Sequence, residues 1–197
     1  MWHRDPVVMP EIRDRLGLEE PARPGIPNEA SPELATEAMD RLDRLLSGEA
    51  QGDTLFLTGA HVSSLLEHAV SELVPPGVSV PRVAIADGDI SVQGQVARRV
   101  FPELADLEPW FPVLPDTVPV SLRGAVLPFG VGEAVLVVRR VEVSGVPLPR
   151  RFHQRVLDAI GRVDRPGLPP EGITVPIPAG LVAVFAQGEH LVLVAGS

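Results

Sequence analysis

The chain has 197 residues and a formal net charge of −9 at neutral pH, and it contains no cysteine. A chain of this length forms one domain, with or without a tail, and can bury roughly 70% of its unfolded surface. The lack of cysteine excludes disulfides, thiolate catalysis and cysteine-ligated metal centres, and the acidic balance argues against nucleic acid as a partner. Hydrophobic residues make up 45% of the chain and aromatic residues only 4%. This composition reflects either coding bias or an aliphatic surface suited to acyl chains.

Residues 1–30 are predicted to form a tail or linker. Prolines are spread through this stretch and charges of both signs crowd together, which is typical of a solvated segment. A short helix over residues 10–18, which could dock on the domain or on a partner, is the alternative. The start of the sequence lacks the apolar run of a signal peptide, and no run of 18 apolar residues follows. Either the protein is cytosolic or the numbering begins after a removed signal or anchor.

Residues 31–197 are predicted to form a single α+β domain, in which a curved, mostly antiparallel sheet packs against about three helices. Ser31 is a good N-cap, and Pro32 suits the first position of a helix with apolar residues at helical spacing. A short strand over 54–58 ends at Thr58, which can cap a second helix over 60–73. A third helix is expected over 150–160.

The strongest local signal is the Asp87-Gly88 pair between two alternating strands, because this dipeptide favours a tight β-hairpin turn. A second antiparallel pair is predicted over 117–127 and 133–144. Three short strands, over 173–177, 181–186 and 191–194, are expected to close the chain.

Two of these strands are apolar on both faces, over 134–138 and 191–195. An antiparallel strand with one solvated face would alternate between apolar and polar residues. Such a strand is either an ordinary central strand or one whose second face meets another sheet, a partner or a lipid. Side chains alternate between faces along a strand, which predicts three sets. The sets are Val120, Leu122 and Val126; Leu136 and Val138; and Val135, Val137, Val141 and Val143.

Four short motifs occur in a fixed order along residues 50–197. They are the threonine-opened segment 58–66 (TGAHVSSLL), the Asp87-Gly88 turn, segment 143–149 (VSGVPLP) before the third helix, and segment 168–173 (LPPEGI) before the closing strands. Their order resembles the LmeA-like phospholipid-binding family of actinobacterial envelope proteins, which is akin to the tubular lipid-binding superfamily. The resemblance implies a curved sheet wrapped on a helix, an aliphatic groove for acyl chains, and no catalysis. The signal or anchor usual in these relatives is not visible here.

The residues that could carry chemistry are better explained by structural roles. His61 and His68 lie seven residues apart on one predicted helix, too far apart for a single metal ion. Ser63 lacks the turn that presents a nucleophilic serine. Asp87 and Asp89 flank a turn that supplies too few acidic ligands for calcium. We therefore expect no enzyme activity, no cofactor and no metal site.

The expected function is non-catalytic binding of a lipid or another apolar ligand in the periplasm or cell envelope. Leu122, Leu136 and Val138 are predicted to line the groove, with Trp110 and Phe111 at its mouth. These two aromatic residues lie between prolines, either as a loop tip at a membrane surface or as a loop anchored in the core. The alternative function is that of a structural or accessory subunit that docks on a larger membrane-associated protein complex.

Overall fold

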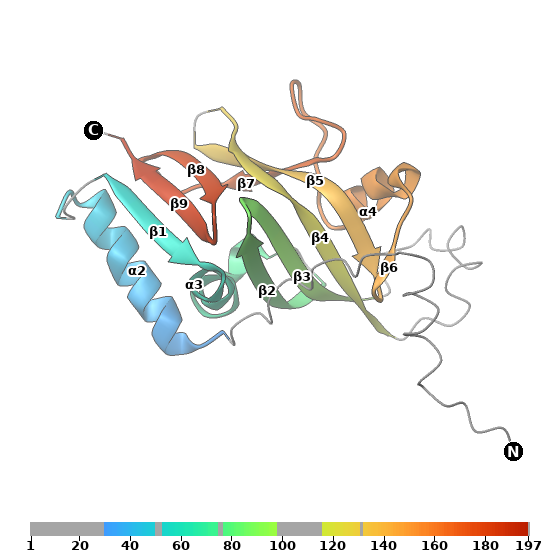
Figure 1. Ribbon diagram of the computed structural model, residues 1–197, viewed down its shortest axis with the longest axis horizontal. Helices are drawn as coiled ribbons and strands as arrows, with labels where there is room; N and C mark the ends of the chain where they lie inside the picture. Colours follow the sequence, from blue (N-terminus) through green and yellow to red (C-terminus); the bar gives the residue numbers. More distant parts are fainter. Residues whose placement is uncertain (1–29, 50–52, 75–76, 98–115, 131, 197) are drawn as a thin grey trace, which may run out of the picture.

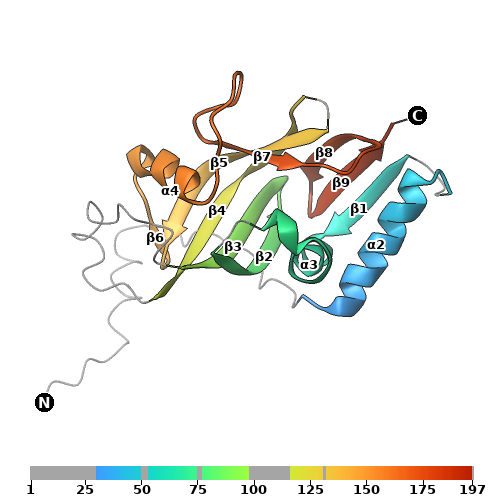
Figure 2. The same cartoon turned by 180° about the vertical axis from the view of Figure 1, so that it is seen from behind.

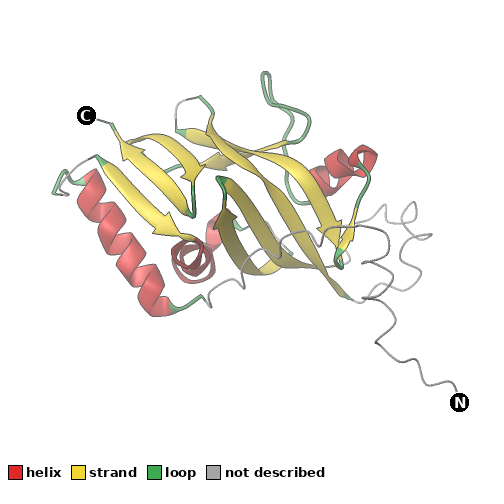
Figure 3. Ribbon diagram, in the orientation of Figure 1, coloured by secondary structure: helices red, strands yellow, loops and turns green. Residues whose placement is uncertain are grey.

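The computed structural model describes residues 30–49, 53–74, 77–97, 116–130 and 132–196. These residues form three α-helices and two antiparallel sheets, which confirms the α+β class predicted from the sequence (Figure 1 and Figure 3). The tail predicted over residues 1–30 falls almost wholly outside the described residues, and so do Trp110 and Phe111. No helix in the described ranges is both long and apolar enough to cross a membrane.

The larger sheet has six strands, and the smaller has three. In the six-stranded sheet the order is β2-β3-β4-β5-β6, and β7 also pairs with β5. Its strands are β2 (Val78–Ala86), β3 (Asp89–Ala97), β4 (Thr117–Pro128), β5 (Glu133–Val143), β6 (Val146–Pro147) and β7 (Gly172–Pro176). The three-stranded sheet has the order β1-β9-β8. Its strands are β1 (Thr54–Thr58), β8 (Leu181–Gln187) and β9 (His190–Ala195).

The helices lie at the two ends of the molecule. Helix α2 (Pro32–Leu46) runs beside the three-stranded sheet, and α3 (Gly59–Ser64) lies between β1 and β2. Helix α4 (His153–Ala159), preceded by a 3₁₀ turn (Arg150–Phe152), sits at the opposite end near β5 and β6 (Figure 1 and Figure 2). Ser31 caps α2 by accepting a hydrogen bond from the Leu34 amide, as the sequence predicted.

The hairpin predicted at Asp87-Gly88 is confirmed. Asp87 and Gly88 have φ angles of 54° and 77°, which is the left-handed pair that a type I′ turn requires. The Gly88 amide also donates a hydrogen bond to the Gly188 carbonyl in the β8–β9 turn, with an N···O distance of 3.0 Å. The tips of two hairpins, one from each sheet, are therefore joined.

Strand β4 alternates as predicted. From Thr117 to Leu127, buried residues alternate with exposed or half-buried ones. Val120, Leu122 and Val126 share the buried face. We call this face of the six-stranded sheet the inner face, and the opposite one the outer face.

Strand β5 departs from the predicted alternation. Arg139 has no partner on β4, so it is an extra residue in a β-bulge, and both Arg139 and Arg140 are exposed. The prediction that Val141 and Val143 face away from Leu136 was wrong, because the bulge shifts the alternation by one residue. Both valines return to the inner face, where they are fully buried.

The second predicted helix is shorter than expected. The α-helix ends at Ser64, and a π-helical turn (Leu65–Ala69) and a 3₁₀ turn (Ser71–Leu73) follow. Its apolar side chains Val62, Leu65 and Leu66 are only partly buried, whereas Ser63 and Ser64 are fully buried. Small side chains are needed here because α3 lies directly against β2: a Cβ on Gly59 would come within 2.4 Å of the Val83 carbonyl oxygen.

The Ser63 hydroxyl joins α3 to β2. Its oxygen accepts a hydrogen bond from the Val83 amide at 2.7 Å and donates to the Gly59 carbonyl at 2.7 Å. The Ser64 hydroxyl similarly accepts from the Ser31 amide at 3.0 Å, which ties α3 to the start of α2. Both serines thus satisfy backbone groups at element junctions.

Replacing Ser63 by alanine is expected to lower the free energy of unfolding by about 1–3 kcal/mol, because the buried Val83 amide loses its acceptor. Urea denaturation followed by circular dichroism measures this loss. Ser79→Ala is the matched control, since Ser79 is exposed and its hydroxyl makes one long hydrogen bond of 3.4 Å. Equal effects of the two substitutions would contradict the junction role of Ser63.

The first turn of α2 carries a group that makes stability depend on pH. Hydrogen bonds from its own backbone amide and from Ser31 hold the pKa of the Glu33 carboxyl below its ordinary value of 4.5. A carboxyl with a lowered folded-state pKa contributes stability above its unfolded pKa, and the contribution disappears as pH falls through the folded value. We expect carbon-detected NMR titration to give a Glu33 midpoint below 4.5. A midpoint at or above that value would contradict the capped geometry.

One hydrophobic core joins both sheets and all three helices. It includes the inner-face residues of β2 to β5, Leu42 and Leu45 of α2, and Val156 and Leu157 of α4. Strand β8 contacts β4, so the smaller sheet closes one side of this core.

Candidate functional site

Leu122, Leu136 and Val138 all lie on the inner face. They come from the neighbouring strands β4 and β5, and each is at most 7% exposed. The structure brings the three together within the hydrophobic core. Their role as ligand contacts stays a prediction, and Trp110 and Phe111 lie outside the described residues.

The second apolar face of β5 is covered locally by the chain itself. Val135 points away from the inner face and is 4% exposed. A Cβ built on Gly172 of β7 would lie within 3.0 Å of both Leu168 and Val135, so these two side chains approach the same point. The segment between α4 and β7 therefore covers this part of β5.

Helix α4 lies in a chain segment that leaves the edge of β5 and later returns to it. The chain leaves the edge after β6 and returns to it in β7, and backbone hydrogen bonds mark both points. The Leu148 amide donates to the Val141 carbonyl at 2.9 Å, and the Val138 amide donates to the Glu171 carbonyl at 2.9 Å. The helix predicted over 150–160 is present as the 3₁₀ turn followed by α4, and the apolar side chains of this segment are buried: Phe152, Val156, Leu157 and Ile160.

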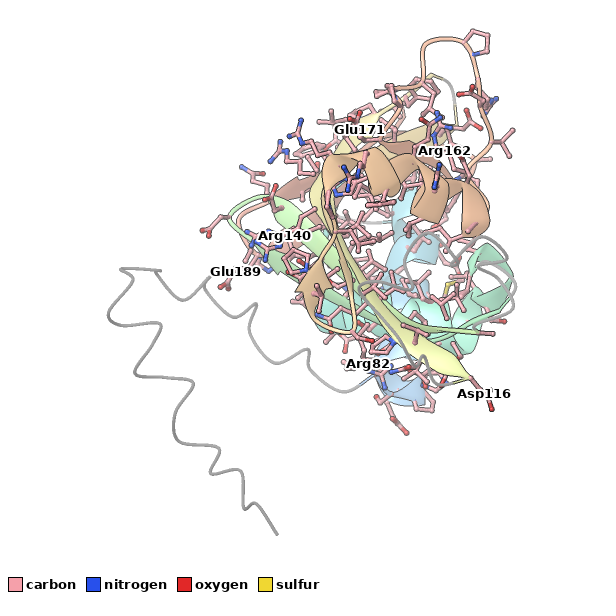
Figure 4. The ribbon with its side chains drawn as sticks, turned by 90° about the vertical axis from the view of Figure 1, so that its right-hand side faces the viewer. Arg82, Asp116, Arg140, Arg162, Glu171 and Glu189 are labelled. Carbon is pink, nitrogen blue, oxygen red and sulfur yellow. The ribbon has the colours of Figure 1, made fainter. Side chains whose placement is uncertain are left out.

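Arg162 fastens the return segment to α4. Its guanidinium donates to Asp158 at 3.1 Å, to Asp164 at 2.8 Å and to the Gly172 carbonyl at 3.1 Å, and Figure 4 shows it beside α4. Burial alone lowers the pKa of Arg162, but the hydrogen bonds to the two carboxylates outweigh burial and raise that pKa above its ordinary value. The guanidinium therefore stays charged, and this buried cation joins α4 to β7.

His61 and His153 have structural positions. His61 completes a capping box with Thr58: its Nδ1 accepts from the Thr58 amide, and its Nε2 lies 3.6 Å from a Glu37 carboxylate oxygen. His153 is 3% exposed, and its Nε2 donates to the Leu148 carbonyl at 3.1 Å. Within the described part of the chain, no group of three histidine, aspartate or glutamate side chains is placed to hold a metal ion.

Asp89 does more than flank its turn. Its carboxylate accepts hydrogen bonds from Arg139 at 2.9 Å and from Arg123 at 3.3 Å. The β-bulge makes the first contact possible, because it turns Arg139 outwards beside the hairpin. Asp89 thereby ties β3 to β4 and β5 on the outer face.

The outer face of the six-stranded sheet carries a cavity of about 280 Å³ that sequence reasoning missed. Its lining comes from β2 to β5 and includes Arg82, Gln93, Ser121 and Glu142, which lie opposite one another in register. Alternating polar residues in the first hairpin were the available signal for a solvated face. Nothing in the sequence indicated that this face would be hollowed.

Val80 lies at the rim of this cavity in an unusual conformation. Val80 and Pro81 together oppose Gly94 in a β-bulge, and Val80 has a φ of 51°. A β-branched residue before proline strongly disfavours the left-handed region, and such strain costs about 1–3 kcal/mol. The bulge leaves the Val80 side chain 50% exposed, at the cavity's edge.

No family model, no curated protein and no solved structure matches the chain.

Proposed function

We propose that this protein is a non-catalytic binding protein of the bacterial cell envelope that takes up an acyl chain between the inner face and the helices that cover it. The observation that carries this proposal is the inner face itself, which is aliphatic across four adjacent strands. Its buried side chains are Val83, Ile85, Ile90, Val96, Val118, Val120, Leu122, Val126, Leu136, Val138, Val141 and Val143. Aliphatic side chains of this kind match the methylene groups of an acyl chain. The resemblance to LmeA-like proteins supports the same function and location.

Entry of a ligand requires part of the core to open, because the residues predicted to contact it are buried. Helix α4 is the element best suited to move. It is seven residues long, and the segment that contains it leaves the edge of β5 after β6 and returns to that edge at β7. An acyl chain would take over the contacts that Phe152 and Val156 make with the core, so the exchange replaces apolar contacts with similar ones.

Native mass spectrometry of gently purified protein, together with uptake of 11-(dansylamino)undecanoic acid, tests this function. We expect a co-purified lipid mass, and a blue shift of dansyl fluorescence that palmitate reverses by competition. Dansylglycine, which carries the fluorophore without the alkyl chain, is the matched control and should show no shift. Absence of both lipid and uptake, or equal responses to the two probes, would contradict the proposal.

The three-stranded sheet favours a second function, docking on a partner protein. Phe56, Val192 and Phe185 are neighbours across β1, β9 and β8 on the face opposite Leu55 and Leu57. Phe56 is 48% exposed, although its ring also meets His190 edge-on. Phe185 is half-buried and Val192 between the two rings is 2% exposed, so Phe56 is the candidate contact for a partner on this face. The net charge of −9 opposes an anionic bilayer as the occupant, so the partner we propose is an apolar protein surface with neutral or basic borders.

Membrane fractionation of the native cells tests docking. Phe56→Ser is expected to release the protein from the membrane fraction, whereas Val163→Ser, at an exposed site in the segment after α4, should not. Co-sedimentation of the purified protein with protein-free vesicles of phosphatidylglycerol and phosphatidylcholine would show that lipid, rather than a protein, is the occupant. Retention of Phe56→Ser in the membrane fraction would also overturn docking through this face.

A further inference from the structure

The outer-face cavity holds free hydrogen-bonding groups. Gln93 and Gln95 of β3 and Ser121 of β4 line it, and all three are partly buried. None of their side chains hydrogen-bonds to another residue in the described part of the chain, so their donors and acceptors face the cavity or solvent. Gln93 and Ser121 lie opposite each other on adjacent strands about 5 Å apart, and Gln95 lies roughly 7 Å further along β3, so the three groups form a compact recognition surface.

The charged residues of the cavity are already paired. Arg82, at one end of the row, forms an ion pair with Glu67, and Glu142, at the other end, accepts from Arg140 at 2.6 Å. Arg82 and Arg140 are both labelled in Figure 4. Because each charge is balanced by its own partner, the groups that remain to bind a ligand are the uncharged amides and the hydroxyl. This arrangement does not favour a phosphate or a carboxylate ligand.

Apolar groups form the rim beside these amides. Val80 projects from the bulge of β2, and Pro119 lies opposite Gln95 on β4. The strained backbone at Val80 places a half-exposed aliphatic side chain where a relaxed strand would not. A ligand that combines polar edges with an apolar face would meet both kinds of group.

We infer that this cavity binds a neutral, hydroxyl-rich ligand, one or two sugar rings of a glycan. A hydroxyl group is both donor and acceptor, as is each glutamine amide, so the two satisfy one another fully. The C–H face of a pyranose ring can pack on Val80 and Pro119. The site lies on the opposite side of the sheet from the core, and it is therefore independent of acyl-chain binding. The sugar can come from a free oligosaccharide or from the headgroup of a glycolipid.

Side-chain amide NMR tests the inference directly. The Gln93 and Gln95 amide signals are followed during titration of the full chain with maltose, cellobiose, mannobiose, N,N′-diacetylchitobiose and inorganic phosphate. We expect at least one disaccharide to shift both signals in a saturable way, and phosphate to shift neither. The same titration with the octyl glycoside of that disaccharide, below its micelle concentration, distinguishes a free oligosaccharide from a glycolipid headgroup. Equal affinity indicates a free sugar, and tighter binding of the glycoside indicates a headgroup. Failure of every disaccharide, or a larger response to phosphate, would overturn the inference.

Substitutions locate the binding. Gln93→Ala and Gln95→Ala should each weaken disaccharide binding about 2- to 10-fold, the loss expected for one or two hydrogen bonds. Gln187→Ala, on the exposed end of β8, is the matched control and should bind normally. Val80→Asn keeps the left-handed backbone accessible but removes the apolar wall, and we expect weaker binding without loss of the fold. Unchanged affinity in both glutamine variants would contradict this assignment.

Discussion

Gly124→Ala is expected to destabilise the protein by about 3 kcal/mol or more, which is at the upper end for overpacking a core position. Gly124 lies on the inner face at the bulge, opposite Val138. A Cβ at this position would come within 2.0 Å of the Val137 carbonyl oxygen and within 3.0 Å of the Val138 Cα. These are backbone atoms of β5, so no side-chain rotation can relieve the overlap. The β4–β5 pairing itself would have to shift.

Thermal denaturation followed by circular dichroism measures this effect. Gly130→Asn is the matched control: Gly130 has a φ of 64° and open space at its Cβ position, and asparagine tolerates that conformation. We expect the control to unfold close to the unchanged protein. A Gly124→Ala protein of normal stability would mean that β4 and β5 are not paired in this register.

Leu136→Glu is expected to remove about 4 kcal/mol or more of stability, which is most of what a marginally stable domain possesses. Leu136 is 6% exposed and lies between Val126 of β4 and Ile173 of β7. The substitution removes aliphatic contacts and buries a carboxyl group with no partner.

Urea denaturation compares this variant with Val182→Glu, which introduces the same group at a site that is 61% exposed. The exposed substitution should change stability by no more than about 0.5 kcal/mol. If Leu136→Glu were equally mild, Leu136 would face an open groove in solution.

The sequence predicted the elements whose local chemistry allows one conformation. Asp87-Gly88 tolerates the two left-handed residues of a type I′ turn, and Ser31 followed by Pro32 favours a helix start, so both were placed correctly. The bulge at Arg139 was missed because simple alternation assumes an unbroken register. Two successive arginines inside a valine-rich strand were the available signal, since both had to reach solvent.

The remaining errors concern contacts between distant segments. The burial of Ser63 was not predicted, because no local pattern shows that β2 approaches there. Gly59 and Ser63, four residues apart, were the signal of that close approach. A residue before a proline favours an extended backbone, so nothing local indicated the left-handed conformation that Val80 adopts in the bulge opposite β3. The hollow beside it depends on this bulge and could not be predicted from residue types.

Paramagnetic broadening of methyl signals by 16-doxyl-stearate tests the central claim most directly. The leucine and valine methyl groups are labelled, and the spin-labelled fatty acid is added and then reduced with ascorbate as the control. Acyl-chain uptake at the inner face predicts selective, reversible broadening at Leu122, Leu136 and Val138, with Val182 unaffected. Broadening confined to Val182 and its neighbours, or no broadening at all, would contradict binding in the interior.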